Sequence, residues 1–384
     1  MVFETLSPEV RKELLAKDTP FFVFDLDKVK SNINRVKSNI NPDKLFYAVK
    51  ANSLPEVLST AAKEDCGFEI NNMGELEKVV NAGGSVADCI NNSPITGAND
   101  VKALYSEGIR DFCIDSKAQV ENLSYNAPGA NVFVRIYNEN KASRFKLNRL
   151  GIHTKDAPEL LKYAKDNGLN LKGVTFHVGS QCSNADNWSE GIYQASILFD
   201  KFPELSSLNI GGGLPVQYAN DIANLESIAE TIDEGINEYF SNKPQVYVEP
   251  GRYIVGDSAS TVSSVTQVEE EDDISRAVVD MSVFSGFMEI IEIGDGFRYN
   301  VIADGNGSKR KYQLEGCTCA GTDIIVPEVK LPKLKVDYKN PQNSSRVVFV
   351  NTGAYSLEYL GNDRAGFNGA PVPDVYIVHN GKLK

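Results

Sequence analysis

The chain has 384 residues, 42% hydrophobic and 24% charged, which is long enough for two domains or for one barrel with an appendage. Its formal net charge of -13 argues against a surface that binds nucleic acid or an acidic membrane. No apolar stretch reaches the roughly 18 residues of a membrane span, and residues 1–20 lack the pattern of a secretory signal. The 6 cysteines form no dense framework, which predicts reduced thiols in a cytoplasmic protein. Cys317 and Cys319 are too close for C-x-x-C ligation, so we expect no metal site.

From residue 20 to about 260, short β-rich runs alternate with helical stretches in roughly eight units. That alternation predicts an α/β fold with a parallel sheet, and the number of units favours a (β/α)8 barrel over an open doubly wound sheet. We therefore expect the barrel over residues 21–256. The β-rich runs are FFVFDL (21–26), LFYAVKA (45–51), GFEINN (67–72), ADCINN (87–92), DFCIDS (111–116), NVFVRIY (131–137), LKGVTFHVGS (171–180), LSSLNIGGG (205–213) and PQVYVEPGR (244–252).

After Gly256 the β-rich runs are joined by turns and show little helical periodicity, as in STVSSVTQVE and RVVFVNTG. This pattern predicts a C-terminal antiparallel β domain over residues 257–384. The acidic run 269–273 is typical of a solvated turn between two of its strands. We expect the N-terminal segment, residues 1–20, to pack with this domain.

Lys50 stands in YAVKAN (47–52), inside a short apolar run that we expect to be a strand. An unpaired ammonium pointing inward from a strand is costly. The amine is therefore paired, extended to the rim, or used as a nucleophile, and the run by itself leaves these three readings open.

Several chemically active residues follow the predicted barrel strands, at the end where barrel enzymes place their active sites. Each alone has an ordinary structural role, but packing does not explain why they gather at strand ends. Glycines that free backbone N–H groups, together with an arginine, form a phosphate seat. A lysine beside such a seat, with an acid and an imidazole, is what pyridoxal phosphate needs. The residues at this rim are Lys50, Glu69, Arg135, His177, Ser180, Gly211, Gly212, Gly213, Glu249 and Arg252.

The motifs YAVKAN, FHVGSQ, GGGLP, EPGR, GCTCAGTD and GAY...FNG stand in this order along the chain. In these motifs the chain resembles the fold-type III pyridoxal-phosphate decarboxylases of ornithine, diaminopimelate, arginine and lysine. That family has an alanine-racemase-like barrel followed by a β domain, and the resemblance covers nearly the whole chain.

The resemblance implies a role for each motif residue. Lys50 would carry the cofactor covalently, His177 would stack on its ring and Glu249 would bind the ring nitrogen. Cys319 would lie near the reacting carbon, and its loop with Asp323 would cross the interface of a homodimer with shared active sites. The phosphate would be held by Ser180, Gly211, Gly212, Gly213, Arg252 and Tyr355.

Glu249 favours decarboxylation over racemisation, because a carboxylate favours protonation of the pyridine nitrogen and so strengthens its pull on electrons. Related racemases, by the same resemblance, have an arginine there. Cys319 suits the second half of the reaction, in which a thiol can donate the proton that replaces carbon dioxide. An isomerase or an inactive regulatory homologue are the alternatives. The chain keeps the residues that an inactive homologue would typically lose.

Two parts of the sequence bear on which amino acid is the substrate. In diamine-forming relatives an acidic residue follows the motif cysteine, whereas here Ala320 stands there. The segment 280–292 offers Asp280, Ser282 and Glu289 for the substrate side chain, but no arginine for a distal carboxylate. We therefore expect a basic amino acid such as ornithine or lysine, as in polyamine biosynthesis. The alternatives are a diaminopimelate or carboxynorspermidine type of substrate, or a modified or carrier-linked amino acid.

Overall fold

The computed structural model describes residues 2–384 except 140, 142, 147–148, 219–223, 294–296, 306–307, 361–365 and 368–371. Asn368 and Gly369, which end the last sequence motif, therefore lie outside the described residues. The chain divides into two compact units. We call Lys30–Pro215 with Ile222–Ile254 the barrel unit, and Met1–Val29 with Val216–Asp221 and Val255–Lys384 the β unit.

The barrel unit contains an 8-stranded sheet in the order β4-β3-β2-β11-β10-β8-β6-β5. Every neighbouring pair in it is parallel. A parallel bridge between Asn91 and Phe112 joins β4 to β5 and closes the ring. The predicted (β/α)8 barrel is confirmed. Its strands are β2 (Lys44–Ala48), β3 (Gly67–Glu69), β4 (Cys89–Ile90), β5 (Asp111–Ile114), β6 (Asn131–Arg135), β8 (Asn170–Thr175), β10 (Ser207–Asn209) and β11 (Gln245–Val248).

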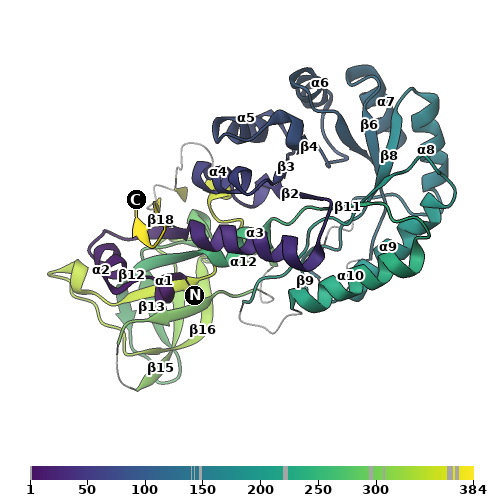
Figure 1. Ribbon diagram of the computed structural model, residues 1–384. Helices are drawn as coiled ribbons and strands as arrows, with labels where there is room; N and C mark the ends of the chain where they lie inside the picture. The colour runs from purple at the N-terminus through teal and green to yellow at the C-terminus, as the bar shows by residue number, and fades with distance from the viewer. Residues whose placement is uncertain are drawn as a thin grey trace. The chain divides into compact units, whose positions relative to one another are not determined.

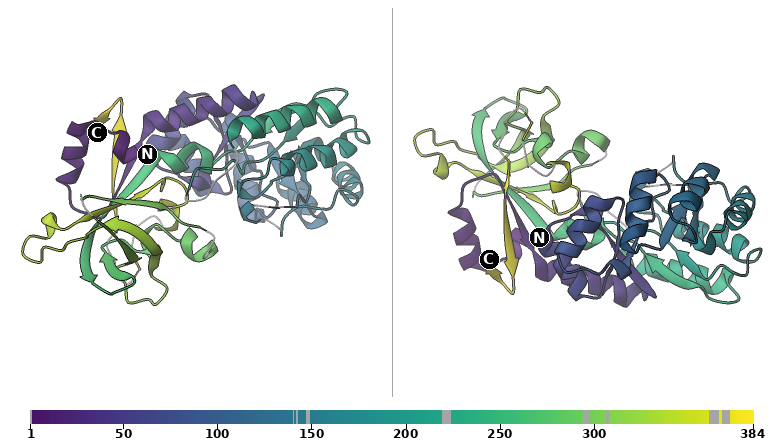
Figure 2. Two further views of the ribbon diagram at one scale, coloured as in Figure 1. Left: turned by 90° about the horizontal axis from the view of Figure 1, so that it is seen from below. Right: turned by 90° about the horizontal axis from the view of Figure 1, so that it is seen from above.

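Helix α3 precedes the first barrel strand, further helices alternate with the strands that follow, and these helices lie outside the ring (Figures 1 and 2). Asn72, Ser116 and Asn224 begin three of them, and each side chain accepts a backbone N–H from the first turn. None of the described helices is long and apolar enough to cross a membrane. The helices are α3 (Leu26–Ile40), α4 (Pro55–Lys63), α5 (Met73–Asn81), α6 (Ala98–Glu107), α7 (Lys117–Asn126), α8 (Ala157–Asp166), α9 (Asp186–Phe199) and α10 (Leu225–Tyr239).

The inside of the barrel is filled near the amino ends of its strands. Phe46, Ile90, Phe133 and Tyr247 form one buried cluster there. Lys172 contacts Asp111 and places its ammonium 5.7 Å from the Phe133 ring centre. Because side chains fill this end, the polar residues at the opposite, carboxyl ends of the strands line the mouth of a packed barrel and not a channel.

The β unit is built on a 9-stranded sheet in which β12 pairs with β1, β13 and β17. Its pairs are antiparallel except β1 with β18 and β13 with β15, so the predicted antiparallel domain is a mixed sheet with mainly antiparallel pairing. The N-terminal helices α1 (Val2–Thr5) and α2 (Pro8–Leu15) bury Phe3, Leu6, Val10 and Leu14 in a cluster with residues of this sheet. The strands are β1 (Phe21–Asp25), β12 (Ala259–Glu269), β13 (Ser275–Val279), β14 (Asn300–Ala303), β15 (Lys309–Glu315), β16 (Ile324–Pro332), β17 (Arg346–Val350), β18 (Asp374–His379) and β19 (Lys382–Leu383).

One prediction about the barrel was wrong. The run 21–26 is not its first strand: β1 pairs with β12 and β18, and the barrel ring begins at β2. Phe21, Phe22, Val23 and Phe24 are all fully buried. A continuous apolar run is typical of any strand covered on both faces, and it does not indicate which sheet the strand joins.

Candidate active site

The candidate residues of the barrel unit gather at the carboxyl ends of its strands. Glu69 is the last residue of β3, and Arg135 is the last residue of β6. His177 comes two residues after β8, and Glu249 directly follows β11. Because parallel strands of a closed barrel end on one rim, these side chains share the barrel mouth.

Lys50 forms an ion pair with Glu69, its Nζ lying 2.7 Å from Oε2. The lysine is not on a strand as predicted, but in the 3₁₀ turn η1 (Val49–Ala51) that follows β2. The turn brings its side chain to the rim with 43% exposure, whereas the Glu69 side chain is only 2% exposed. Of the three readings that the sequence left open, the structure supports a paired amine at an accessible rim.

Glu249 is a buried carboxylate held by two amides. Asn92 donates to its Oε1 at 2.8 Å and Asn209 donates to the same oxygen at 2.6 Å. Burial, and next the charge of Glu69, raise the pKa of Glu249 to about 7, against the effects of the amides and Lys50. The group therefore changes charge in the neutral range, which is common for residues that take part in chemistry.

His177 is a neutral imidazole. Burial lowers its pKa well below 6.5, and the positive charges of Arg135 and Lys50 lower it further. Its Nδ1 accepts the Gly179 N–H at 2.9 Å, so in the neutral ring the proton sits on Nε2. An uncharged flat ring with a fixed tautomer suits stacking on an aromatic cofactor.

The glycines that follow β10 form a loop with no room for side chains. Gly211 and Gly213 have φ angles of +67° and +95°, in the left-handed region that favours glycine. A Cβ on Gly211 would lie 2.4 Å from the Phe176 carbonyl oxygen, and one on Gly212 would lie 2.4 Å from that of Glu249. The loop therefore lies directly against the backbone that carries His177 and Glu249.

A cationic group lies in the same unit. Arg252 begins the short helix α11 (Arg252–Val255) and donates from Nε to Ser180 Oγ at 3.0 Å. Its guanidinium lies 4.5 Å from the Phe145 ring centre, and the residue is 3% exposed. Ser180 begins β9 (Ser180–Cys182), whose Cys182 N–H bonds Gly213 O at 3.0 Å. The guanidinium, the hydroxyl and the glycine loop thus form a seat for a phosphate group.

The comparisons with known proteins identify the family. The family model "Pyridoxal-dependent decarboxylase, pyridoxal binding domain" matches residues 26–256. This chain belongs to that family. It is a pyridoxal-phosphate-dependent amino-acid decarboxylase, and the lysine, buried acid, neutral imidazole and glycine cradle described above fit the cofactor.

Relatives of the decarboxylase match it over nearly its full length. It is 31% identical to a lysine/ornithine decarboxylase of Selenomonas ruminantium over 92% of this chain and 89% of the relative. It is 28% identical to antizyme inhibitor 2 of Xenopus laevis, over 92% of this chain and 80% of that one. A crystal structure of SrLDC in complex with PLP and cadaverine superposes with a TM-score of 0.86 at 30% identity, covering 97% of this chain and 94% of that chain.

In the β unit, Asp323 holds the loop of the GCTCAGTD motif. Its carboxylate accepts from Ser282 Oγ at 2.9 Å, from the Val283 N–H at 2.9 Å, and from Thr318 through both N–H and hydroxyl. A Cβ on Gly316 would lie 2.1 Å from Oδ1, so this glycine is also required. Asp323 and Ser282, both predicted to contact substrate, are therefore in contact with each other.

Asp280 lies apart from that pair. Its carboxylate accepts from Ser263 Oγ at 2.6 Å, from the Ser264 N–H at 2.9 Å, and from Thr19 Oγ1 at 2.5 Å. It lines a cavity of about 400 Å³ together with Arg346, whereas Ser282, Glu289 and Asp323 do not. Asp280 and Ser282 have different partners although only the buried Met281 separates them, because β13 ends at Val279 and the chain no longer follows a regular strand there.

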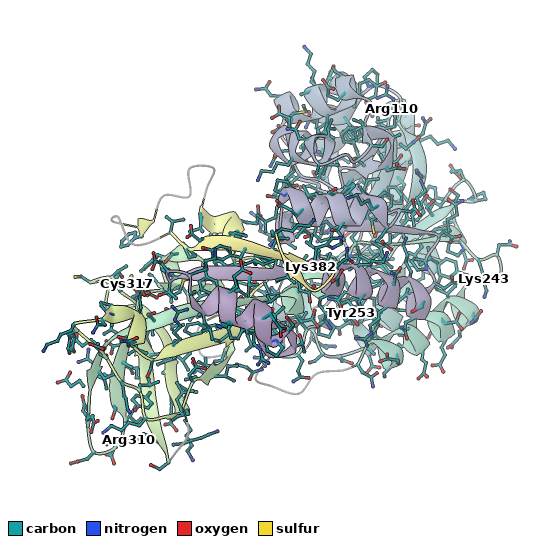
Figure 3. All side chains as sticks on the ribbon, turned by 60° about the vertical axis from the view of Figure 1, so that its left-hand side comes forward. Arg110, Lys243, Tyr253, Arg310, Cys317 and Lys382 are labelled. Carbon is teal, nitrogen blue, oxygen red and sulfur yellow. The ribbon has the colours of Figure 1, made fainter. Side chains whose placement is uncertain are left out.

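Three further predicted residues lie in the β unit. Glu289 begins α12 (Glu289–Ile293) and is 2% exposed. Tyr355 adopts a left-handed φ of 53°, which holds its backbone in an uncommon conformation. Cys319 and Cys317 are the two exposed thiols of the chain, and Figure 3 labels Cys317 at the surface of the unit.

Two residues were missed by the sequence analysis, the amides Asn92 and Asn209 that contact Glu249. They stand in the predicted β-rich runs ADCINN and LSSLNIGGG, in each case at the carboxyl end of the strand. A polar residue at the end of a buried strand is the signal in the sequence that indicates these two amides.

Proposed function

We propose that this decarboxylase acts on an amino acid with a basic or modified side chain, and that it releases carbon dioxide and an amine. The observation that carries the proposal is the buried Glu249 with its raised pKa, beside the Lys50–Glu69 pair. The names of relatives support the substrate class, because one is a lysine/ornithine decarboxylase and another was crystallised with cadaverine.

Each barrel residue has a defined part in this proposal. Lys50 would bind the cofactor covalently, with the Glu69 carboxylate beside it. His177 would stack on the ring, with Arg135 nearby, and Glu249 would contact the ring nitrogen. When bound, pyridoxal phosphate supplies an electron sink for the carbon that loses carbon dioxide. The phosphate would be held by Ser180, Gly211, Gly212, Gly213 and Arg252.

Cys319 would supply the proton that replaces the lost carboxylate on the substrate α-carbon. Its exposure on the β unit suits a thiol that acts on a site completed by a second chain. We therefore propose a head-to-tail homodimer in which the Cys319 loop enters the partner's site. The six free thiols are compatible with work in the cytoplasm.

The residues that contact the side chain of the substrate must leave room for its terminal group. Asp280 accepts three hydrogen bonds and Asp323 four within this chain, so a substrate ammonium would have to compete with those donors. With Ala320 in place of an acid, this favours a side chain modified at its end. A carrier-linked amino acid, diaminopimelate or carboxynorspermidine is the second candidate.

The test is a panel of ornithine, lysine, arginine, diaminopimelate and carboxynorspermidine scored by release of carbon dioxide. The proposal expects turnover with a basic amino acid above turnover with diaminopimelate. A strong preference for diaminopimelate would overturn it and would point to an arginine, with Arg298 as the first to be replaced. Loss of optical rotation without carbon dioxide would indicate an isomerase. No reaction with any of the five, despite bound cofactor, would favour a modified substrate or an inactive regulatory homologue.

A further inference from the structure

Glu249 is contacted by two amides that reach it from different sides of the barrel. Asn92 follows β4, whereas Asn209 ends β10, which is paired with β11 just before Glu249. Asn92 Nδ2 also bonds Thr175 Oγ1 of β8 at 3.0 Å. Its side chain therefore crosses the barrel mouth. Asn92 is 7% exposed and Asn209 is fully buried, so neither amide is exchanged easily for water.

Both amides bond the same carboxylate oxygen. The distances to Oε1 are 2.8 Å from Asn92 and 2.6 Å from Asn209. Within the part of the chain that the structure describes, no donor bonds Oε2. The carboxylate thus has one oxygen fixed by the protein and one oxygen left for another partner.

Among the described residues, the orientation of the Asn92 amide leaves its own carbonyl oxygen buried without a partner, which costs free energy. Its Oδ1 is buried and, among the described residues, has no hydrogen-bond partner. An unpaired buried carbonyl is unfavourable. Turning the amide over would not be more favourable, because it would place Oδ1 against the negatively charged carboxylate of Glu249. The donor that points at Glu249 is therefore the feature that this arrangement preserves.

The charged groups around Glu249 make the two donors necessary. Burial and the Glu69 carboxylate both oppose its ionisation, whereas Lys50 and the two amides favour it. The nearby thiol of Cys113 is neutral, because burial raises its pKa. Lys50 is already paired with Glu69, so the amides are the donors that act on Glu249 directly.

We propose that Asn92 and Asn209 are positioning residues that hold Oε1 of Glu249, keep the carboxylate ionised, and leave Oε2 for the pyridine nitrogen of the cofactor. The inference rests on the proposed contact between Glu249 and that nitrogen. It adds that the proton on the ring nitrogen depends on two neutral amides on strands β4 and β10. Replacing either donor weakens the ionised carboxylate and with it the protonated ring.

The two positions need different variants. Asn209 also accepts the Gly211 N–H on Oδ1 at 2.9 Å, so an alanine there would disturb the glycine loop. Asn209→Asp keeps that acceptor and replaces only the donor. Asn92→Asp makes the same exchange, and the smaller, neutral Asn92→Ala serves if a second carboxylate prevents folding. Asn131→Asp is the matched control, since Asn131 donates to the Asp111 carboxylate at 2.8 Å at the amino end of the barrel.

The decisive measurement is the ¹⁵N chemical shift of the ring nitrogen in enzyme loaded with ¹⁵N-labelled pyridoxal phosphate at pH 7. We expect a protonated nitrogen in the wild type and the Asn131→Asp control. In the Asn92 and Asn209 variants, the ratio of protonated to unprotonated nitrogen should fall by about tenfold or more, because each lost donor shifts the pKa of Glu249 by about one pH unit. A pH titration of the apoprotein followed by NMR of ¹³C-labelled glutamate should show a higher pKa for Glu249 in the Asn92 and Asn209 variants than in the wild type.

The Glu249→Gln variant distinguishes the proposed contact between Glu249 and the ring nitrogen from the proposed positioning role of the two amides. If this variant leaves the ring nitrogen as protonated as in the wild type, the proposed function of Glu249 is wrong. If Glu249→Gln removes the proton but the Asn92 and Asn209 variants behave like Asn131→Asp, the positioning role alone is overturned. If the protonated fraction of the ring nitrogen falls in the Glu249, Asn92 and Asn209 variants and stays unchanged in the control, both proposals are supported.

Discussion

The Nζ atom of Lys50 lies 2.7 Å from Oε2 of Glu69, at the ends of the neighbouring strands β2 and β3. The carboxylate is buried and the ammonium is half-exposed, so the pair is anchored in protein and open to the barrel mouth. A lysine must lose a proton before it can act as a nucleophile. Glu69 holds the ammonium at the barrel mouth, where we propose that the cofactor binds.

Replacing Lys50 with alanine should reduce carbon dioxide release to the limit of detection, because it removes the amine that binds the cofactor. Borohydride reduction of the wild type, followed by peptide mass analysis, should locate the cofactor on Lys50. Lys117→Ala is a suitable control, since Lys117 pairs with Glu159 on the exposed outer surface. Reduced cofactor on any other lysine would show that the assignment is wrong.

The stability of the apoprotein should depend on the ionisation of Glu249. Its folded pKa of about 7 lies above the ordinary glutamate value of 4.5, so the folded state binds this proton more tightly than the unfolded state. The contribution is present at low pH and is lost as the pH rises through the folded pKa, by roughly 1–3 kcal/mol. Thermal unfolding measured from pH 5 to pH 8 should show this fall in stability. In the Glu249→Gln variant, stability should depend less on pH over the same range. An equal slope in both proteins would contradict the assignment.

Alanine at Gly213 should weaken cofactor binding more than backbone strain alone explains. Gly213 and Gly83 have similar φ angles of +95° and +92°. A Cβ on Gly213 would lie 2.5 Å from the Gly179 carbonyl oxygen, whereas nothing lies within 4 Å of one on Gly83. Each substitution should cost about 1–2 kcal/mol of stability from strain. Only Gly213→Ala should raise the dissociation constant for pyridoxal phosphate, as measured by titration of the apoprotein. A matching rise in Gly83→Ala would argue against the glycine cradle.

Mixing two inactive chains should restore activity if the sites are shared. In a dimer of Lys50→Ala with Cys319→Ala, one of the two sites contains both native residues. Random exchange of subunits therefore restores about a quarter of all sites. Carbon dioxide release by the mixture, with exchange followed by mass spectrometry of native dimers, measures this. Proven exchange without recovery would mean that each chain forms its own site.

Ala320→Asp should raise turnover of ornithine. A new carboxylate beside Cys319 offers the distal ammonium a charge-assisted hydrogen bond of about 1.5–3 kcal/mol, which corresponds to roughly tenfold or more in kcat/KM. Ala320→Asn is the matched control, because it has the same shape without the charge. An equal effect of both substitutions, or none of either, would show that position 320 does not meet the substrate's amine.

The sequence by itself determined the class of fold and most of the barrel rim. Period-two and helical patterns are local, so the alternation of strands and helices could be followed residue by residue. Residues such as Glu69, Arg135 and Glu249 stand directly at the ends of those strands, and parallel strands must end together. Their common location therefore follows from the order of elements alone.

Only the tertiary structure decided what depends on partners distant in the chain. The run 21–25 joined β12 and β18 instead of the barrel, because burial on both faces of a strand is the same in either sheet. Asp280 and Asp323 carry the same carboxyl group, yet Thr19 and Ser263 surround one while Ser282 and Thr318 surround the other. Asn92 reached Glu249 across 157 positions of sequence, a contact that exists only once the ring of strands is closed. Hydrogen bonds between such residues are set by where the closed sheet places their strands, and no local pattern contains that information.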